Sequence, residues 1–86
     1  MARYRKKPVV IEAEQWVAPN PDDPASLQED HLMVLYGGED EVGPFGRINT
    51  LEGRMRVRPG DWIITGVAGE HYPIKDEIFQ QTYEPA

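Results

Sequence analysis

The sequence predicts an α+β domain: a small antiparallel sheet of about five strands, open or partly closed into a barrel, with one or two short helices. Three observations predict it. Short runs alternate between apolar and polar residues, as in half-buried strands. Glycine and proline turn signals separate these runs. Helical spacing of apolar residues occurs only in two short stretches. With 86 residues the chain has room for one core, so residues 1–86 form a single domain.

Residues 9–17 predict the first strand, after a basic N-terminal segment at residues 1–7. The apolar residues that alternate with polar or mixed positions are Val9, Ile11, Ala13 and Val17. This period of two is typical of a half-buried antiparallel strand. Trp16 falls on the face opposite Ile11, which places it at a sheet end or at an oligomer contact.

Residues 18–25 are rich in proline and aspartate and predict a loop. A capping-box pattern from Ser26 to Glu29 follows. We expect a helix over residues 27–36, ended by Gly37 and the glycine after it. Residues 32–36 alternatively form a buried strand, because a continuous apolar run does not separate the two.

A hairpin is predicted between residues 47 and 58, with Glu52 and Gly53 as its two-residue turn. In this register Arg47 faces Arg58 and Ile48 faces Val57. One face then carries Ile48, Thr50, Met55 and Val57. The other carries Arg47, Asn49, Leu51, Arg54, Arg56 and Arg58. Like charges placed opposite one another destabilise a sheet, so this second face needs solvent, carboxylates or an anion.

A second hairpin is predicted in the last third of the chain. Pro59 and Gly60 predict a type II turn, which leads into a strand at residues 61–65. A turn at Ala68 and Gly69 then leads to a strand at residues 70–74. Residues 75–83 have helical spacing, with Asp76 as a candidate cap.

Composition excludes several classes of site. The chain has no cysteine, so disulfides, thiolate chemistry and zinc fingers are impossible. His31 and His71 are its only histidines, and we expect no metal and no cofactor. No apolar run has the length of a membrane-spanning helix, so we expect no membrane partner and a cytoplasmic protein. A lean apolar fraction of 40% makes a homo-oligomer reasonable.

Charge is polarised along the chain. The net charge of −6 argues against nucleic acid as a partner. The basic residues fall mainly into two clusters, in residues 1–7 and in residues 47–58. A solvated sheet face paired with carboxylates would explain the second cluster. The use of arginine alone, where lysine would serve solubility equally well, favours binding of an anion.

The candidate ligand-binding residues are Arg47, Asn49, Arg54, Arg56, Arg58, Trp62 and Tyr72. Guanidinium groups match phosphate oxygens in paired geometry, and an aromatic ring can stack on a base. The secondary candidates are Arg3, Arg5, Lys6 and Lys7, which more simply protect a sheet edge. Glu70 and His71 are adjacent in a strand, so they point to opposite faces and make no catalytic pair.

Both ends of the chain resemble a family of small proteins encoded by phages and prophages. The resemblance lies in YRKKPVVIEA with Gln15-Trp16, in TLEG, in PGDWIITGV, and in the Gly69-Glu70, Tyr72-Pro73, Ile78-Phe79 and TYEP pairs and runs that follow. Residues 17–47 fall outside it. The family has no established general activity, so the resemblance carries over no catalytic residues. Its members often have a cysteine where this chain has Ile74.

The resemblance and the arginine pattern together predict a non-enzymatic binding protein in the host cytoplasm. The expected ligand is a small phosphorylated molecule, and the candidate is a nucleotide signal of host antiviral defence that the protein sequesters. The alternative is a protein–protein interaction module that docks on a host or virion protein through the same arginines. An enzyme is not expected, because the sequence shows no catalytic motif.

Overall fold

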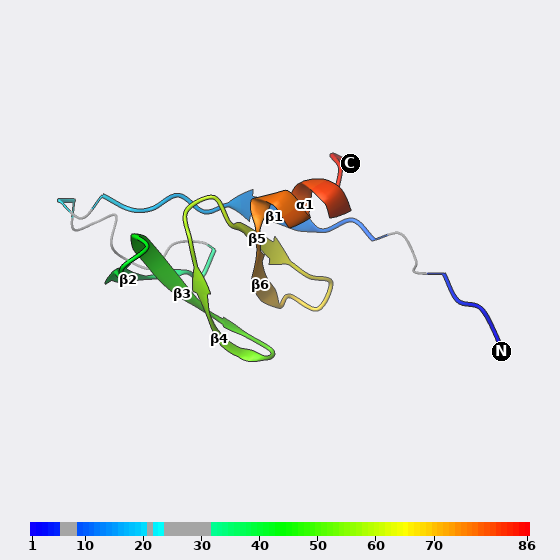
Figure 1. Ribbon diagram of the computed structural model, residues 1–86. Helices are drawn as coiled ribbons and strands as arrows, with labels where there is room; N and C mark the ends of the chain where they lie inside the picture. Colours follow the sequence, from blue (N-terminus) through cyan, green and yellow to red (C-terminus); the bar gives the residue numbers. More distant parts are fainter. Residues whose placement is uncertain (6–8, 21, 24–31) are drawn as a thin grey trace.

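The computed structural model describes residues 1–5, 9–20, 22–23 and 32–86, and its strands form two antiparallel sheets (Figure 1). The first sheet has the order β1-β5-β6 and the second the order β2-β3-β4. The elements are β1 (Glu12–Gln15), β2 (Leu35–Glu39), β3 (Pro44–Thr50), β4 (Gly53–Val57), β5 (Trp62–Thr65), β6 (His71–Ile74) and α1 (Asp76–Thr82). The predicted α+β class holds coarsely. The described strands make two sheets rather than one, and no closed barrel.

The arginine hairpin is present, but in a different register. Arg47 pairs with Arg56 and Thr50 with Gly53, so the turn is Leu51-Glu52 rather than Glu52-Gly53. The Thr50 hydroxyl donates to the Gly53 carbonyl at 2.8 Å and accepts from the Glu52 amide at 3.1 Å, which fixes this earlier turn. The slip is two residues, so every side chain keeps its predicted face.

The helix predicted over residues 27–36 is wrong wherever the structure describes it. Residues 32–34 carry no helix, and β2 begins at Leu35, as in the alternative prediction of a strand. Leu32 and Val34 are buried, whereas Met33 between them is exposed and has a φ of 64°. The expected helix stop at Gly37 instead lies at a register shift between Tyr36 and Gly38. Residues 27–31 lie outside the described residues.

The second predicted hairpin is confirmed as β5 and β6. β1 pairs with β5 and is shorter than the predicted strand. The prediction of which face of residues 9–17 is buried is wrong at the C-terminal end of the range. Val17 is 78% exposed there, whereas Trp16 is 3% exposed. The indole buries more apolar area than a valine side chain, and the Trp16 amide donates to the Asp61 carbonyl at 2.8 Å.

The core lies between the two sheets. Its buried members are Trp16, Leu32, Val34, Ile48, Val57 and Ile63. Ile48 and Val57 come from the apolar face of the arginine hairpin, and Ile63 comes from β5. The opposite face of the hairpin sheet therefore points away from the core. This places the arginines on the outside of the molecule.

The helix α1 covers the other face of the first sheet. The Trp62 and Phe79 rings stack with centroids 4.0 Å apart, and Tyr83 lies 5.3 Å beyond Phe79. The expected capping role of Asp76 is wrong, because Lys75 is the N-cap and makes no side-chain cap bond. Asp76 instead accepts from Trp62 Nε1 at 2.8 Å and from Gln80 Nε2 at 3.2 Å. These bonds, that of Trp62 first, lower the pKa of Asp76.

We expect Ile48→Ala to lower the free energy of unfolding by about 2–5 kcal/mol, because Ile48 is 1% exposed and its loss leaves a cavity between the sheets. Denaturant unfolding followed by tryptophan fluorescence measures the change. Leu51→Ala is the control, since Leu51 is 86% exposed at the hairpin turn, and it should change stability by about 0.5 kcal/mol or less. Equal effects of the two variants would contradict the two-sheet core.

Candidate anion-binding face

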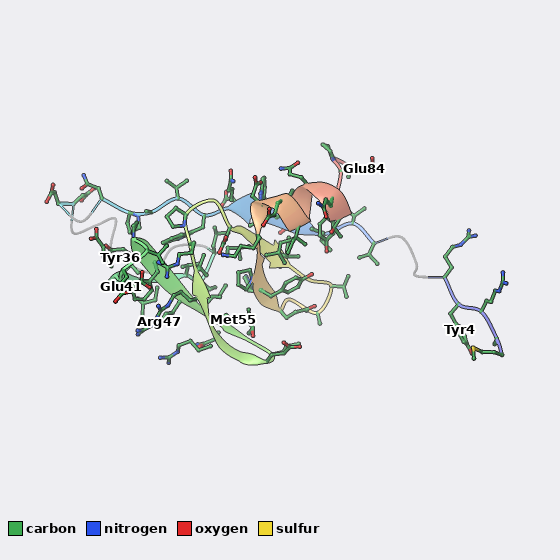
Figure 2. All side chains as sticks on the ribbon, in the orientation of Figure 1. Tyr4, Tyr36, Glu41, Arg47, Met55 and Glu84 are labelled. Atoms are coloured by element: carbon green, nitrogen blue, oxygen red, sulfur yellow. The ribbon has the colours of Figure 1, made fainter. Side chains whose placement is uncertain are left out.

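The outer side of the β2-β3-β4 sheet carries the arginines, and we call it the arginine face. Its basic and amide side chains are Arg47, Asn49, Arg54 and Arg56, joined by Arg58 just after β4. Arg47 lies directly opposite Arg56, and Asn49 lies opposite Arg54. Figure 2 shows the Arg47 side chain on the hairpin sheet. The structure thus gathers the predicted hairpin residues on one surface. Like charges at opposed positions also need a partner there.

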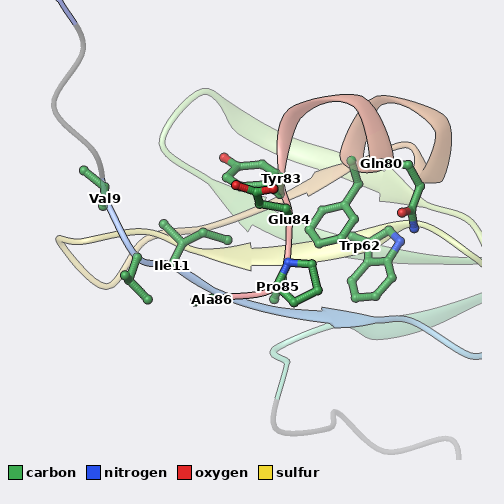
Figure 3. Close-up of a pocket in the computed structure, with 11 residues that line it drawn as sticks. Val9, Ile11, Trp62, Gln80, Tyr83, Glu84, Pro85 and Ala86 are labelled. Carbon is green, nitrogen blue, oxygen red and sulfur yellow. The ribbon is translucent and has the colours of Figure 1, made fainter.

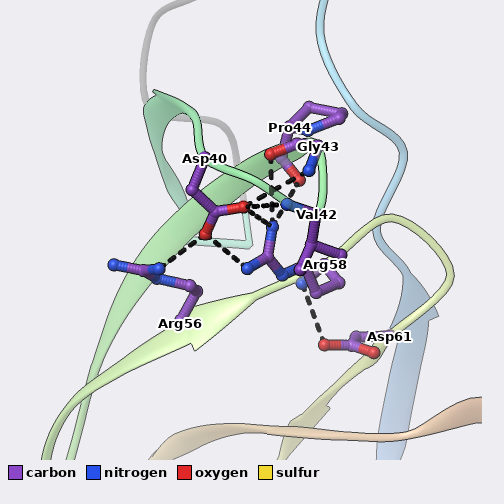
Figure 4. Close-up of polar contacts among 7 residues, drawn as sticks. All are labelled: Asp40, Val42, Gly43, Pro44, Arg56, Arg58 and Asp61. Carbon is purple, nitrogen blue, oxygen red and sulfur yellow. Dashed lines mark hydrogen bonds and ion pairs between the residues drawn. The ribbon is translucent and has the colours of Figure 1, made fainter.

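Asp40, in the turn between β2 and β3, supplies the partner for two of these arginines (Figure 4). Arg58 donates from Nη1 to Oδ1 of Asp40 at 2.8 Å and from Nη2 to Oδ2 at 2.5 Å. Arg56 donates from Nη1 to Oδ2 at 2.6 Å. The paired bonds from Arg58 have the fork geometry in which arginine holds carboxylate or phosphate.

The Asp40 carboxylate is also held by its own turn. It accepts from the Val42 amide at 2.9 Å and from the Gly43 amide at 3.3 Å. The hydrogen bond from Arg58, followed by these two amide bonds, holds the pKa of Asp40 well below its usual range. Reciprocally, Asp40 raises the pKa of Arg58. Local sequence pattern did not identify Asp40 as a partner, because the two arginines that it binds lie 16 and 18 residues further along the chain.

The Phe45 ring orders three guanidinium groups on this face. Arg56 lies over the ring at 4.2 Å from its centroid, with Arg47 at 5.4 Å and Arg58 at 5.7 Å. A cation over an aromatic face is attracted by the ring quadrupole. Phe45 is buried and packs against Gly37, where an added Cβ would overlap the ring. The absence of a side chain at Gly37 thereby lets the Phe45 ring lie under the arginines.

The arginine face keeps an excess of positive charge. One carboxylate, that of Asp40, contacts Arg56 and Arg58. Among the residues that the structure describes, Arg47 and Arg54 form no ion pair, and both are exposed. Arg47, Asn49 and Arg54 therefore present donors to solvent beside an arginine pair that already holds one carboxylate.

The two predicted aromatic residues do not join this face. Trp62 lies on the other sheet, stacked on Phe79 of α1. Tyr72 pairs with Ile64 on the same face of that sheet. Burial, then a hydrogen bond with Tyr83, raises the pKa of Tyr72 to about 12. Both rings therefore serve the packing of α1, and the sequence could not show this because it did not separate the two sheets.

The basic N-terminal candidates are also apart from the arginine face. Arg3 and Arg5 lie in an exposed segment that extends away from both sheets (Figure 1). Lys6 and Lys7 lie outside the described residues. Sequence alone left open whether this segment would reach a site on the hairpin.

Several hollows lie elsewhere on the molecule. One of about 430 Å³ separates residues 9–11 from α1 and the C-terminal residues, with Trp62 in its wall (Figure 3). Another of about 340 Å³ lies between the hairpin tip and β6, and a third of about 330 Å³ lies beside β1. None of the three is lined by Arg47, Arg54, Arg56 or Arg58.

Glu70 and His71 both line the hollow at the hairpin tip, although they were expected on opposite faces. Glu70 precedes β6, so strand alternation does not apply to it. Each binds its own turn: Glu70 accepts from the Ala68 amide at 3.0 Å, and His71 Nδ1 lies 3.1 Å from the Gly69 carbonyl. In the described part of the chain, no group of three or more acidic or histidine side chains is placed to hold a metal ion.

The described residues include no helix with the length and apolar character needed to cross a membrane. Comparison with known proteins adds no relative: no family description, no curated protein and no solved structure matches this chain. Function is therefore inferred from the geometry and charge of the arginine face.

The ion pair predicts a dependence of stability on pH. The folded-state pKa of Asp40 lies below its ordinary value of 3.8, so the carboxylate stabilises the fold above that pH and the contribution is lost as pH falls below it. We expect Asp40→Asn to lower the melting temperature at pH 7 and to flatten its fall between pH ~5 and ~2. Thermal denaturation across this range measures both.

The matched control is Glu41→Gln, at an exposed carboxylate in the same turn that makes no ion pair with any described residue. This variant should keep the pH dependence of the unchanged protein. If Asp40→Asn melts like the unchanged protein at every pH, the ion pair does not stabilise the fold.

Proposed function

We propose that this chain is a non-enzymatic binding protein whose arginine face captures a small phosphorylated ligand. The observation that carries the proposal is the charge balance of that face: it holds four arginines, and among the described residues Asp40 is the one carboxylate that forms an ion pair with any of them. A face of this kind attracts anions, and Asp40 and Phe45 hold three of its guanidinium groups in place before the ligand arrives.

The chemistry of the exposed part of the face fits phosphate. Arg47 and Arg54 offer planar forks of donors that pair with two phosphate oxygens. Asn49 lies opposite Arg54 and can add an amide donor. Arg56 donates to Asp40 from Nη1 alone. Its remaining guanidinium donors form no hydrogen bond with a described residue. A ligand with more than one phosphate group can thus contact Arg47, Arg54 and Arg56 together.

The placement of the aromatic residues limits how a base would be recognised. Trp62 and Tyr72 lie on the other sheet, so within one copy they cannot stack on a base held at the arginine face. In the proposed complex the phosphates supply most of the affinity. A base would be covered only by a second copy, which suits a homo-oligomer. The resemblance of the chain ends to phage proteins supports capture of a nucleotide signal of host defence in the host cytoplasm.

A second candidate function is docking on an acidic protein, and the openness of the face favours it. Leu35 is 53% exposed and lies directly opposite Arg47, so an apolar side chain adjoins the basic residues. The hollows described above lie elsewhere on the molecule. An open surface that combines arginine with apolar side chains is typical of protein contacts.

We expect Arg47→Gln combined with Arg54→Gln to abolish ligand binding while the fold persists, because both side chains are exposed. The measurement is calorimetric titration with pyrophosphate and with a panel of linear and cyclic nucleotides, supported by the shift in melting temperature that a ligand of the folded state produces. Lys6→Gln with Lys7→Gln is the matched control, since it removes the same charge from residues other than those of the arginine face.

Asp40→Asn gives the opposite expectation. Removing the carboxylate that binds Arg56 and Arg58 should tighten phosphate binding several-fold, because phosphate then no longer competes with Asp40 for these two guanidinium groups. A ligand concentration of ~1 mM detects even weak binding, with a dissociation constant of the same size. If neither pyrophosphate nor any nucleotide binds the unchanged protein at that concentration, the ligand proposal is wrong. A host protein retained by the unchanged chain, and lost with Arg47→Gln and Arg54→Gln, would then support docking.

A further inference from the structure

The N-terminal segment takes part in neither sheet. Residues 1–5, which we call the arm, are all exposed, and Tyr4 is 94% exposed. Arg3 and Arg5 form no ion pair or hydrogen bond with any described residue. The arm extends away from the sheets, and the molecule measures 55 × 25 × 23 Å along its principal axes (Figure 1). It carries basic charge on a chain whose net charge is −6.

The hollow at the hairpin tip has the opposite character, and we call it the hairpin cleft. Its volume is about 340 Å³, and it lies between the β3–β4 turn and the start of β6. Leu51, Met55 and Pro73 supply apolar surface, and Leu51 and Met55 are among the exposed large apolar side chains of the chain. Glu52 lines it from the hairpin and Glu70 from the turn before β6.

Both carboxylates have capacity for a further partner. Glu52 makes no ion pair with a described residue. Glu70 accepts one bond, from the Ala68 amide to Oε2. No lysine or arginine is among the residues that line the cleft, and its one histidine, His71, lies with Nδ1 3.1 Å from the Gly69 carbonyl. The cleft therefore combines apolar surface with two glutamates and has no lysine or arginine of its own.

We propose that the arm of one copy of this chain docks in the hairpin cleft of a second copy. An extended arm places Arg3 and Arg5 on the same side, about 7 Å apart, at twice the rise of a strand residue. The aliphatic stems of the arginines can lie on Leu51 and Met55 while their guanidinium groups bind Glu52 and Glu70. The occupant is thus fixed by complementary charge and by matching apolar surface.

The exchange closes on itself when two copies pair. Each copy supplies one arm and one cleft, so a two-fold dimer satisfies both and leaves neither element to recruit a third copy. Two acidic bodies repel one another at long range, and the arms offset this repulsion locally. Contacts of this kind weaken when salt screens them. The proposal uses none of the residues of the arginine face, so phosphate binding by one copy is tested separately, and only the covering of a base by a second copy depends on association.

A charge exchange between two variants tests the proposal. One variant carries Arg3→Glu and Arg5→Glu, and the other carries Glu52→Lys and Glu70→Lys. Each alone sets like charges against one another, so self-association should weaken by about tenfold or more. An equimolar mixture should associate again, because the acidic arm then meets the basic cleft and the basic arm meets the acidic cleft. Sedimentation velocity over a range of concentrations, at ~50 mM and ~500 mM salt, measures each state.

Two controls keep the outcome decisive. Glu41→Lys with Glu77→Lys makes the same charge change at exposed carboxylates outside the cleft, and its association should equal or exceed that of the unchanged chain. Circular dichroism confirms that each variant folds. A monomeric unchanged protein at low salt would overturn the proposal. So would variants that associate like the unchanged chain, or a mixture that stays monomeric.

Discussion

The arrangement of the two sheets depends on Arg58, which joins three parts of the chain at the end of β4. Its guanidinium group binds Asp40 in the β2–β3 turn, while its backbone amide donates to Asp61 Oδ2 at 2.9 Å. The Asp61 carbonyl in turn accepts from Trp16, next to β1. These bonds join the end of the hairpin sheet to the start of the other sheet. The buried apolar side chains of the core lie between the two sheets.

The same contact divides the arginine face into two parts with different chemistry. Arg58 and one nitrogen of Arg56 bind Asp40, which leaves this part of the face less capacity for another anion. Arg47 and Arg54 keep their charge and their exposure. Asp40 binds its two arginines through a fork that a phosphate group could also occupy. The Asp40 carboxylate therefore occupies the kind of arginine fork in which the proposed phosphate ligand would bind.

Charge of opposite sign is segregated over the described surface. Arginines lie on the outside of one sheet, whereas Glu52 and Glu70 border the cleft at the hairpin tip. Where the structure describes them, Glu70 and His71 bind their own turn rather than each other. A protein with such surfaces can hold an anion on one side and a basic segment on another. The two surfaces can act together without sharing a residue.

The sequence by itself determined the local features of this protein. Period-two patterns located the two hairpins, and the faces of the arginine hairpin were correct despite its shifted register, since a slip of two residues preserves them. Only the tertiary structure decided that Leu35 begins a strand, that Asp40 binds Arg58, and that Trp62 packs under α1. These outcomes depend on contacts between residues far apart in the chain, which no local pattern encodes. Local periodicity assigns faces, and the packing of the two sheets decides what each face meets.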